Sequence, residues 1–350
     1  MIDIENYCWA PSMLPEEADG MTARVTAVHR ERYELVCSHG TVLGKLKTAV
    51  YYGQGEEFPT VGDFVLIQYE ASGDSLIIKT LPRKSFFSRR DPTPGRGEQA
   101  VASNFDTVFV MTSLNKDFNV GRLERYLTLA WQSGATPVVV LTKADLTDDY
   151  ETQIQAVQEI TVGVDVIAVS AVNGQGLDRL DPYIQPGKTV VFLGSSGVGK
   201  SSLLNALAGE KLMDVKAIRE DDSRGRHTTT HRQLFMLPSC AMVIDTPGMR
   251  ELGMWDVSVG LGEAFSDVEE ILSHGCKFTD CHHQTEPGCA VKSAIKDGEL
   301  SDDRWQNYLK LKHEAKYTDD KIGFMRERQQ WHKSLAKWSK NMKKNGEIKK

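Results

Sequence analysis

The stretch Thr189-Val-Val-Phe-Leu-Gly-Ser-Ser-Gly-Val-Gly-Lys-Ser-Ser-Leu-Leu-Asn-Ala-Leu207 decides the fold of this 350-residue chain. Its segment from Gly194 to Ser201 reads G-x-x-x-x-G-K-S, the pattern of a phosphate-binding P-loop. The β-branched and apolar residues before the loop predict a buried parallel strand, and Ser202 to Ala208 predict a helix with three leucines on one face. Strand, glycine loop and helix follow in the required order, which favours a P-loop over an ordinary glycine and serine turn.

The chemistry of this loop follows from its glycines and from the helix behind it. Glycines let the backbone N–H groups point inward, and the helix N-terminus adds positive potential. We expect Lys200 to reach the β- and γ-phosphates of a nucleotide and to assist catalysis there, and the Ser201 hydroxyl to bind Mg²⁺. The residues expected to contact the nucleotide are Gly194, Ser195, Ser196, Gly197, Val198, Gly199, Lys200, Ser201 and Ser202.

Composition limits the class of protein. A chain of 350 residues with 40% hydrophobic residues suggests two or three globular domains. No apolar run approaches the roughly 20 residues of a membrane span, and the acidic N-terminus Met1-Ile-Asp-Ile-Glu-Asn6 does not resemble a signal peptide. We therefore expect a cytoplasmic protein without membrane contacts.

Charge is distributed unevenly along the chain. The net charge is −6, yet the segment from Arg304 to Lys350 holds 14 Lys and Arg against 5 Asp and Glu. A basic tail on an acidic body suggests a polyanionic partner.

The N-terminal third predicts an all-β domain. Residues 1–20 read as a flexible leader, and residues 21–84 hold five short alternating strands separated by turn signals, which fits a barrel of the OB type. Such barrels bind oligonucleotides, so Tyr51, Tyr52 and Phe64 are candidates for stacking on bases. For any single one of them, a place inside the barrel is the stronger interpretation. Residues 85–99 read as a basic linker. The segment either only connects the two domains or also contacts a phosphate backbone, and the sequence favours neither.

Residues 100–258 predict an α/β domain. Strands at 106–112, 136–141 and 165–169 alternate with helices at 120–133, 148–162 and 176–183, which is typical of a doubly wound, mostly parallel sheet. In such sheets ligands bind at the carboxyl ends of the strands. Asp145, Ser170 and Gly194 all lie at such ends.

Three short motifs add a base and a metal to this picture. Thr142-Lys143-Ala144-Asp145 matches the [NT]-K-x-D pattern, in which the carboxylate accepts the guanine N1–H and N2–H₂ and the lysine stem packs over the base. Ser170 and Ala171 fit the companion loop, whose backbone N–H faces the guanine O6. Asp245-Thr-Pro-Gly248 fits D-x-x-G, with the aspartate near Mg²⁺ and the Gly248 amide near the γ-phosphate. Each match alone is weak, but all three follow predicted strands in a chain with a P-loop.

The order of these motifs is permuted, because the base-reading motifs precede the P-loop. In this the chain closely resembles the RsgA/YjeQ family of ribosome-associated, circularly permuted bacterial GTPases, over nearly its whole length. The resemblance implies hydrolysis of GTP to GDP and phosphate, late maturation of the small ribosomal subunit, and rRNA binding by the flanking domains. It also implies other assembly factors nearby, and we expect a monomer.

The family resemblance also points to the polar stretch Gly225-Arg-His-Thr-Thr-Thr230. Met249 follows the D-x-x-G glycine, and its thioether cannot orient a water molecule for attack. The family resemblance therefore makes His227 a candidate catalytic residue. The alternative is that His227 is only a solvated residue of a loop. One of Thr228, Thr229 and Thr230 is expected to sense the γ-phosphate and Mg²⁺.

A metal site is predicted near the C-terminus. Cys276-x₄-Cys281-x-His283-x₅-Cys289 offers three thiolates and one imidazole, the ligand set of a closed structural Zn²⁺ site. His282 is an equal alternative by spacing, and the family pattern favours His283. Residues 259–350 therefore read as a mostly helical zinc-binding domain with a basic tail. Its aromatic residues either pack on the zinc domain or accompany the basic face toward rRNA phosphates.

Two other functions compete with that of a GTP hydrolase. The first is that of a P-loop kinase or ATPase, which does not explain the motif Thr142–Asp145 or the two flanking domains. A non-catalytic RNA-binding switch would use the nucleotide only to stabilise the fold.

Overall fold

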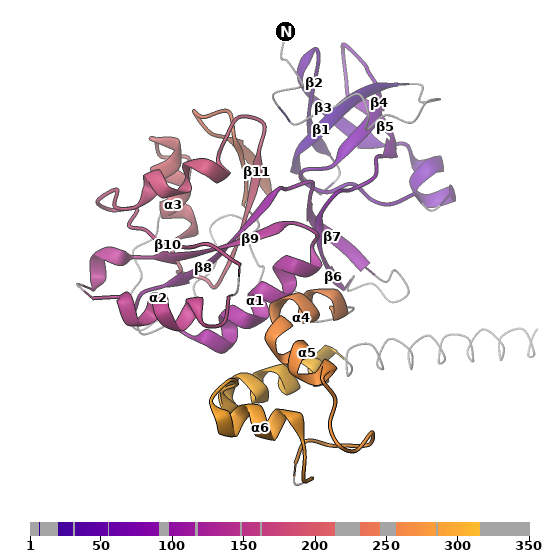
Figure 1. The fold of residues 1–350 in the computed structure, drawn as a ribbon. Coiled ribbons are helices and arrows are strands. Elements are labelled where there is room, and N and C mark those ends of the chain that lie inside the picture. Colours follow the sequence, from indigo (N-terminus) through magenta and orange to yellow (C-terminus); the bar gives the residue numbers. More distant parts are fainter. Residues whose placement is uncertain are drawn as a thin grey trace, which may run out of the picture. The chain divides into compact units, whose positions relative to one another are not determined.

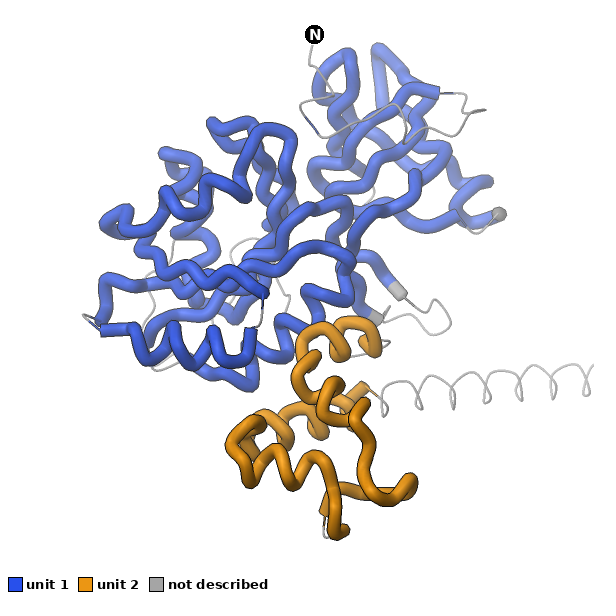
Figure 2. Tube along the Cα trace, in the orientation of Figure 1, with its two compact units in different colours: residues 1–252 blue, residues 253–350 orange. Residues whose placement is uncertain are grey.

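The computed structural model describes residues 7, 20–30, 32–54, 56–90, 98–115, 118–147, 149–161, 163–213, 232–245, 257–284 and 286–315. The chain forms two compact units, residues 1–252 and residues 253–350 (Figure 2). Among the described residues, no helix has both the length and the apolar character needed to cross a membrane.

Five strands of the first unit close into a barrel (Figure 1). They are β1 (Met21–Val28), β2 (Tyr33–Cys37), β3 (Gly40–Leu46), β4 (Phe64–Gln68) and β5 (Ser75–Thr80). β1 pairs with both β2 and β4, and the ring is completed by the antiparallel pairs β2–β3 and β4–β5 and the parallel pair β3–β5. The predicted OB-type barrel is therefore confirmed.

The structure confirms the stronger interpretation, a place inside the fold, for two of the three aromatic residues. The short helix η3 (Ala49–Gln54) places Tyr51 in the barrel core with 2% of its surface exposed, and Phe64 is 1% exposed. Neither ring is available for a base, whereas Tyr52 is 62% exposed. Tyr51 is held inside because its hydroxyl forms a 3.0 Å hydrogen bond with Thr80 Oγ1.

The stretch 85–99, expected as a linker, supplies part of a hairpin. Strand β6 (Phe86–Arg90) pairs antiparallel with β7 (Glu98–Ser103). Phe87 is buried and stacks on Phe105, with 5.0 Å between ring centroids. The apolar ring anchors β6, which composition alone did not indicate.

A parallel sheet forms the rest of the first unit, as predicted. Its strands lie in the order β10 (Val166–Ala168), β9 (Thr136–Thr142), β8 (Thr107–Ser113), β11 (Thr189–Gly194), β13 (Met242–Asp245) and β12 (Gln233–Met236), with only β12 antiparallel. The order continues into the barrel, because Ala27 of β1 pairs with Gln233 of β12.

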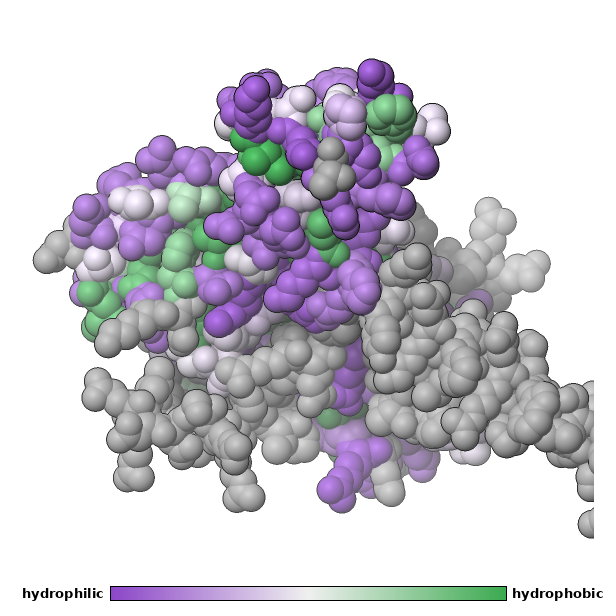
Figure 3. Space-filling model, turned by 90° about the horizontal axis from the view of Figure 1, so that it is seen from below, coloured by the Kyte–Doolittle hydropathy of each residue, from purple (hydrophilic) through white to green (hydrophobic). Residues whose placement is uncertain are grey.

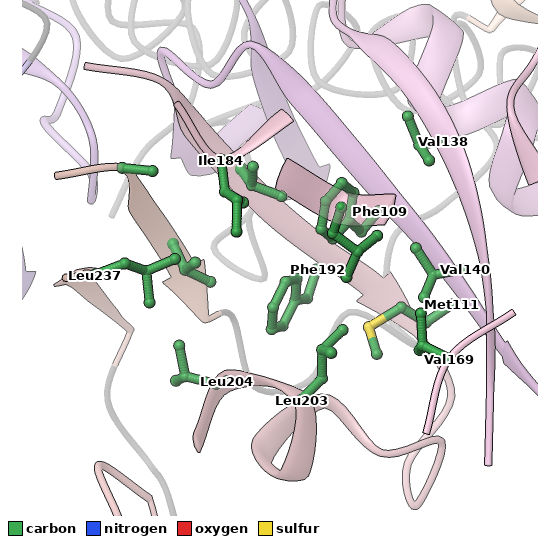
Figure 4. Close-up of a cluster of buried hydrophobic side chains, with 14 of the residues drawn as sticks. Phe109, Met111, Val138, Val140, Val169, Ile184, Phe192, Leu203, Leu204 and Leu237 are labelled. Carbon is green, nitrogen blue, oxygen red and sulfur yellow. The ribbon is translucent and has the colours of Figure 1, made fainter. Parts of the chain in front are cut away.

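Helices and a packed core support this sheet. The helical segments are α1 (Val120–Gln132), η4 (Ala144–Leu146), α2 (Glu151–Gln158), η5 (Leu177–Tyr183) and α3 (Lys200–Ala208). α2 is shorter than the helix expected at 148–162, and just before it Asp149 Oδ1 accepts a hydrogen bond from the Glu151 N–H. Leu203 and Leu204 of α3 point toward Phe192 of β11 (Figure 4). This packing fixes the P-loop helix on its own strand.

The second unit is helical in its described part. It contains α4 (Ser258–Ala264), α5 (Ser266–Ser273), α6 (Ala290–Asp297) and a helix over residues 302–315. Arg304 donates two 2.6 Å hydrogen bonds to Asp267 and lies 4.7 Å from the ring centre of Phe265, so the last helix is tied to α5. Most of the basic tail, from residue 316 onward, lies outside the described residues.

Candidate functional site

The P-loop lies between β11 and α3. Gly199 has a φ of +111°, a conformation that side chains rarely adopt, and a Cβ on Gly194 would lie 2.7 Å from the Met111 carbonyl oxygen. Glycine is therefore required at both positions. Lys200 Nζ donates hydrogen bonds of 2.8 Å to the carbonyl oxygens of Gly194 and Ser195, which draws its ammonium over the loop.

Val198 takes a different role from its neighbours. Its side chain is 1% exposed and belongs to the core cluster beneath the loop, so only its backbone is available to a ligand. The Val198 carbonyl oxygen accepts a 2.5 Å hydrogen bond from Thr142 Oγ1. Thr142, the first residue of the T-K-x-D motif, thus braces the P-loop.

The remaining residues predicted to read the base lie together at the ends of β9 and β10. Ser170 Oγ donates a 2.6 Å hydrogen bond to Asp145 Oδ1, and the Ala144 N–H donates to the Val169 carbonyl at 3.1 Å. Lys143 adopts a left-handed backbone, with φ 60° and ψ 41°. The bend lets the chain leave β9 and immediately form the short η4 turn that carries Asp145.

A pocket of about 390 Å³ adjoins the Asp145 carboxylate. Its lining includes Tyr150, Asn173 and Gln175, and Gln175 Nε2 donates a 3.0 Å hydrogen bond to the Tyr150 hydroxyl. The bond joins the loop after β10 to the start of α2. The sequence did not predict that Tyr150 and Gln175 line the site, because neither residue belongs to a motif.

The site lies where the topology of the sheet reverses. The chain adds β8, β9 and β10 in one direction and then adds β11 and β13 in the other, so the P-loop begins at the switch point between β8 and β11. Asp245 ends β13, the strand parallel to and beside β11, and is 6% exposed. Its carboxylate therefore lies at the same sheet edge as the P-loop.

Several predicted residues lie outside the described residues. They are His227, Thr228, Thr229, Thr230, Gly248 and Met249.

A second candidate site is the cysteine and histidine cluster of the second unit. The ligand atoms of Cys276, Cys281, His283 and Cys289 all lie within 4.8 Å of one another. The His283 Nδ1 atom is 3.4–3.7 Å from the three sulfur atoms. A tetrahedral zinc ion with ordinary bond lengths places sulfur and nitrogen ligands about 3.6 Å apart, so this geometry fits zinc.

Backbone groups and an aromatic ring complete the cluster. The hydrogen bond from the Ala290 N–H to Cys276 Sγ, 3.4 Å long, lowers the pKa of that thiol. Burial raises the pKa of the Cys281 thiol to about 11, and a bound cation would favour its thiolate. The Trp305 ring meets the His283 ring edge to face at 5.4 Å. His283, and not His282, thus turns its ring nitrogen toward the cysteines, as the family pattern favoured.

A P-loop at the switch point, preceded in sequence by the base-reading strands, defines the class of circularly permuted P-loop GTPases. The model of the RsgA GTPase family matches residues 80–255. The chain is 48% identical over 295 residues, 84% of its length and 83% of the relative's, to the Listeria monocytogenes serotype 4b protein named Small ribosomal subunit biogenesis GTPase RsgA 2.

Solved structures agree with this match. YjeQ from Thermotoga maritima has a TM-score of 0.60 at 27% identity, with 83% of this chain and 96% of YjeQ covered. YloQ, described as a circularly permuted GTPase, has a TM-score of 0.60 at 28% identity, with 87% and 98% covered. This chain belongs to the RsgA GTPase family.

Proposed function

We propose that the protein hydrolyses GTP to GDP and phosphate at the carboxyl edge of the parallel sheet. One observation carries this proposal: two hydrogen bonds join the motifs into a single site. Thr142 bonds to the P-loop carbonyl of Val198, and Ser170 bonds to the Asp145 carboxylate. Because the base and the triphosphate belong to one nucleotide, the P-loop and the base-reading residues must lie at a fixed separation.

The base is read by Asp145, whose carboxylate accepts the N1–H and N2–H₂ of guanine. The Lys143 stem packs over the ring, and the backbone around Ser170 and Ala171 donates to O6. Adenine offers no such pair of donors, and a carboxylate that the bound base covers without them would cost several-fold in affinity or more. The pocket beside Asp145 leaves room for the base edge.

The phosphates lie on the loop from Gly194 to Ser202. Lys200 exchanges its carbonyl partners for β- and γ-phosphate oxygens, and its charge stabilises the negative charge that develops during hydrolysis. The Ser201 hydroxyl and the Asp245 carboxylate are hard oxygen donors at one sheet edge, which suits Mg²⁺. When bound, Mg²⁺ neutralises the phosphate charge.

Water activation is assigned to residues outside the described ones. In this proposal His227 orients the attacking water, the Gly248 amide binds the γ-phosphate, and one of Thr228, Thr229 and Thr230 senses it. Loss of the γ-phosphate then releases the segment, as in other GTPase switches.

The metal of the Cys276, Cys281, His283 and Cys289 cluster is proposed to be Zn²⁺ in a structural role. Four protein ligands close a tetrahedral site and leave no position for a substrate. The ion fixes the loop against the helix over residues 302–315 through the His283–Trp305 contact.

The biological partner is proposed to be the small ribosomal subunit and its rRNA, with other assembly factors nearby. Relatives carry the name small ribosomal subunit biogenesis GTPase. Support comes from the OB-type barrel and from the basic tail. On the face shown in Figure 3 the described surface is mostly hydrophilic, with hydrophobic side chains in small groups, which argues against a large apolar partner on that face.

Nucleotide binding and turnover test the proposed activity. With Mg²⁺ present, the protein should bind and hydrolyse GTP and leave ATP unhydrolysed. Lys200→Ala and Ser201→Ala should remove turnover, and Lys188→Ala, an exposed lysine at the opposite end of β11, is the matched control. Equal binding of ATP and GTP would contradict the guanine site. GTP binding without turnover, even with subunits present, would favour the non-catalytic switch.

A further inference from the structure

Arg24 is a fully buried arginine at the junction of the barrel and the parallel sheet. It lies on β1 with 0% of its surface exposed. Its guanidinium donates to the carbonyl oxygens of Gly62, Tyr7 and Asn104 at 3.3, 2.7 and 3.0 Å. Phe64 lies beneath it, 5.0 Å from ring centre to guanidinium carbon. A planar group with five directed donors fixes geometry more tightly than an apolar filler does.

Two further contacts of Arg24 reach the strands that end in the nucleotide site. Nη2 donates a 3.0 Å hydrogen bond to Thr189 Oγ1, and Nη1 lies 3.2 Å from Met242 Sδ. Thr189 is the first residue of β11, which ends at the P-loop, and Met242 is the first residue of β13, which ends at Asp245. Arg24 therefore holds the amino ends of both strands together.

Thr189 is fixed from its other side as well. Its N–H donates a 2.9 Å hydrogen bond to Asp106 Oδ2, and its carbonyl oxygen accepts from the Asp106 N–H at 2.7 Å. Thr189 has no exposed surface. A displacement of Arg24 is therefore passed to β11, because the threonine has no free space in which to absorb it.

The far end of β1 meets the site by a second, independent route. Ala27 of β1 pairs with Gln233 of β12, and Gln233 pairs with Asp245 of β13. A single row of strand pairs thus runs from the barrel to the proposed Mg²⁺ ligand. Through Arg24 and through this row, β1 is connected to both halves of the phosphate site.

We propose that Arg24 is a positioning residue for GTP turnover, which couples occupation of the barrel by RNA to the alignment of β11 and β13. The inference rests on the proposed function and deepens it, since it names the path by which a partner on the barrel regulates hydrolysis. Arg24 lies at the amino end of β11, about 17 Å of strand away from the P-loop, and contacts no nucleotide. Its effect is a coupling between two sites and not a contribution to chemistry.

The test separates coupling from stability. Arg24→Met keeps an unbranched buried side chain, and Thr189→Val removes one hydroxyl at nearly constant shape. Thr26→Val is the matched control, because the Thr26 hydroxyl bonds only to Glu34 within the barrel among the contacts described. For each variant we would measure melting temperature, GTP affinity, subunit affinity, and the kcat of hydrolysis with and without small ribosomal subunits.

Thr189→Val should lower the subunit-dependent increase in kcat about fivefold, the rate effect of one net hydrogen bond, and Arg24→Met should lower it at least as much because it also removes the contact with Met242. GTP affinity, subunit affinity and unstimulated kcat should stay within about twofold. The double variant should lose no more than the stronger single variant, because both changes break one contact. Thr26→Val should behave as the unaltered protein.

Full stimulation in Thr189→Val, or losses that multiply in the double variant, would overturn the proposal. If Arg24→Met fails to fold, Thr189→Val and Thr26→Val still decide the question. An unaltered protein that neither hydrolyses GTP nor responds to subunits would instead overturn the proposed function, and this inference with it.

Discussion

Thr142 shows how a motif residue can act outside the role that its motif suggests. It opens the T-K-x-D sequence that predicts a guanine site, yet its hydroxyl bonds to the P-loop carbonyl of Val198 at 2.5 Å and to the Thr112 carbonyl at 3.3 Å. Asp145, three residues on, faces the pocket instead. In the proposed site, two residues of one motif therefore serve the two ends of the same nucleotide.

Thr142→Val should weaken GTP and GDP binding together, by about five- to tenfold, because it removes one buried hydrogen bond that holds the P-loop. Thr142→Ser should restore most of the affinity. Calorimetric titration with both nucleotides and with ATP checks this. A variant that binds phosphates normally but no longer rejects ATP would show that Thr142 reads the base.

Asp145→Asn should lose GTP affinity by roughly 10- to 100-fold, the effect of losing a charged hydrogen-bond acceptor. It should gain affinity for xanthosine triphosphate, because the amide presents a donor to the carbonyl that xanthine carries at C2. Competition binding with both nucleotides measures the exchange. Glu151→Gln, a change at another acidic residue of the pocket, is the control and should leave the preference for GTP intact.

At the scale of elements, sequence patterns predicted the parallel sheet but not the contacts that join it to the barrel. The β-branched and apolar run from Thr189 to Leu193 predicted a buried strand, and the glycine loop after it predicted the P-loop, both from local residues. Arg24 lies in an alternating strand that looks ordinary, and its burial depends on carbonyl groups from three distant segments. Contacts of that kind have no local signal.

The metal cluster likewise combines features that the sequence predicted with one that only the structure shows. Spacing predicted a closed site with three cysteines and one histidine but did not choose between His282 and His283; the family pattern favoured His283, and the structure brings its ring to the cysteines. His283 has a φ of +60°, a backbone conformation that the sequence did not predict. In this conformation its ring lies toward the three sulfur atoms.

Cys281→Ser should lower the zinc content and the affinity for small subunits, while hydrolysis measured without subunits stays within about twofold. The reason is that a site with three ligands binds metal weakly and the local fold depends on the metal. Cys240→Ser, at an exposed cysteine of the first unit, is the matched control. Metal analysis and subunit pelleting give the readouts, and full zinc content in Cys281→Ser would contradict the proposed ligand set.

At the scale of the whole molecule, the charges separate into an acidic body and a basic end. The segment from Arg304 to Lys350 carries 14 Lys and Arg against 5 Asp and Glu in a chain whose net charge is −6. Basic residues that bind phosphates release counterions, so subunit binding should weaken by at least tenfold between 50 and 200 mM salt, an order-of-magnitude expectation. The rest of the chain is acidic on balance, so we assign most of the attraction to phosphates to the basic end.

GTP hydrolysis by the purified protein with small subunits, with large subunits and with neither is the most direct test of the central claim. We predict that small subunits raise kcat by at least about tenfold, a lowering of the barrier by about 1.4 kcal/mol, and that large subunits do not. Turnover that is equal under all three conditions, or that follows ATP as readily as GTP, would contradict a guanine-specific enzyme acting on the small ribosomal subunit.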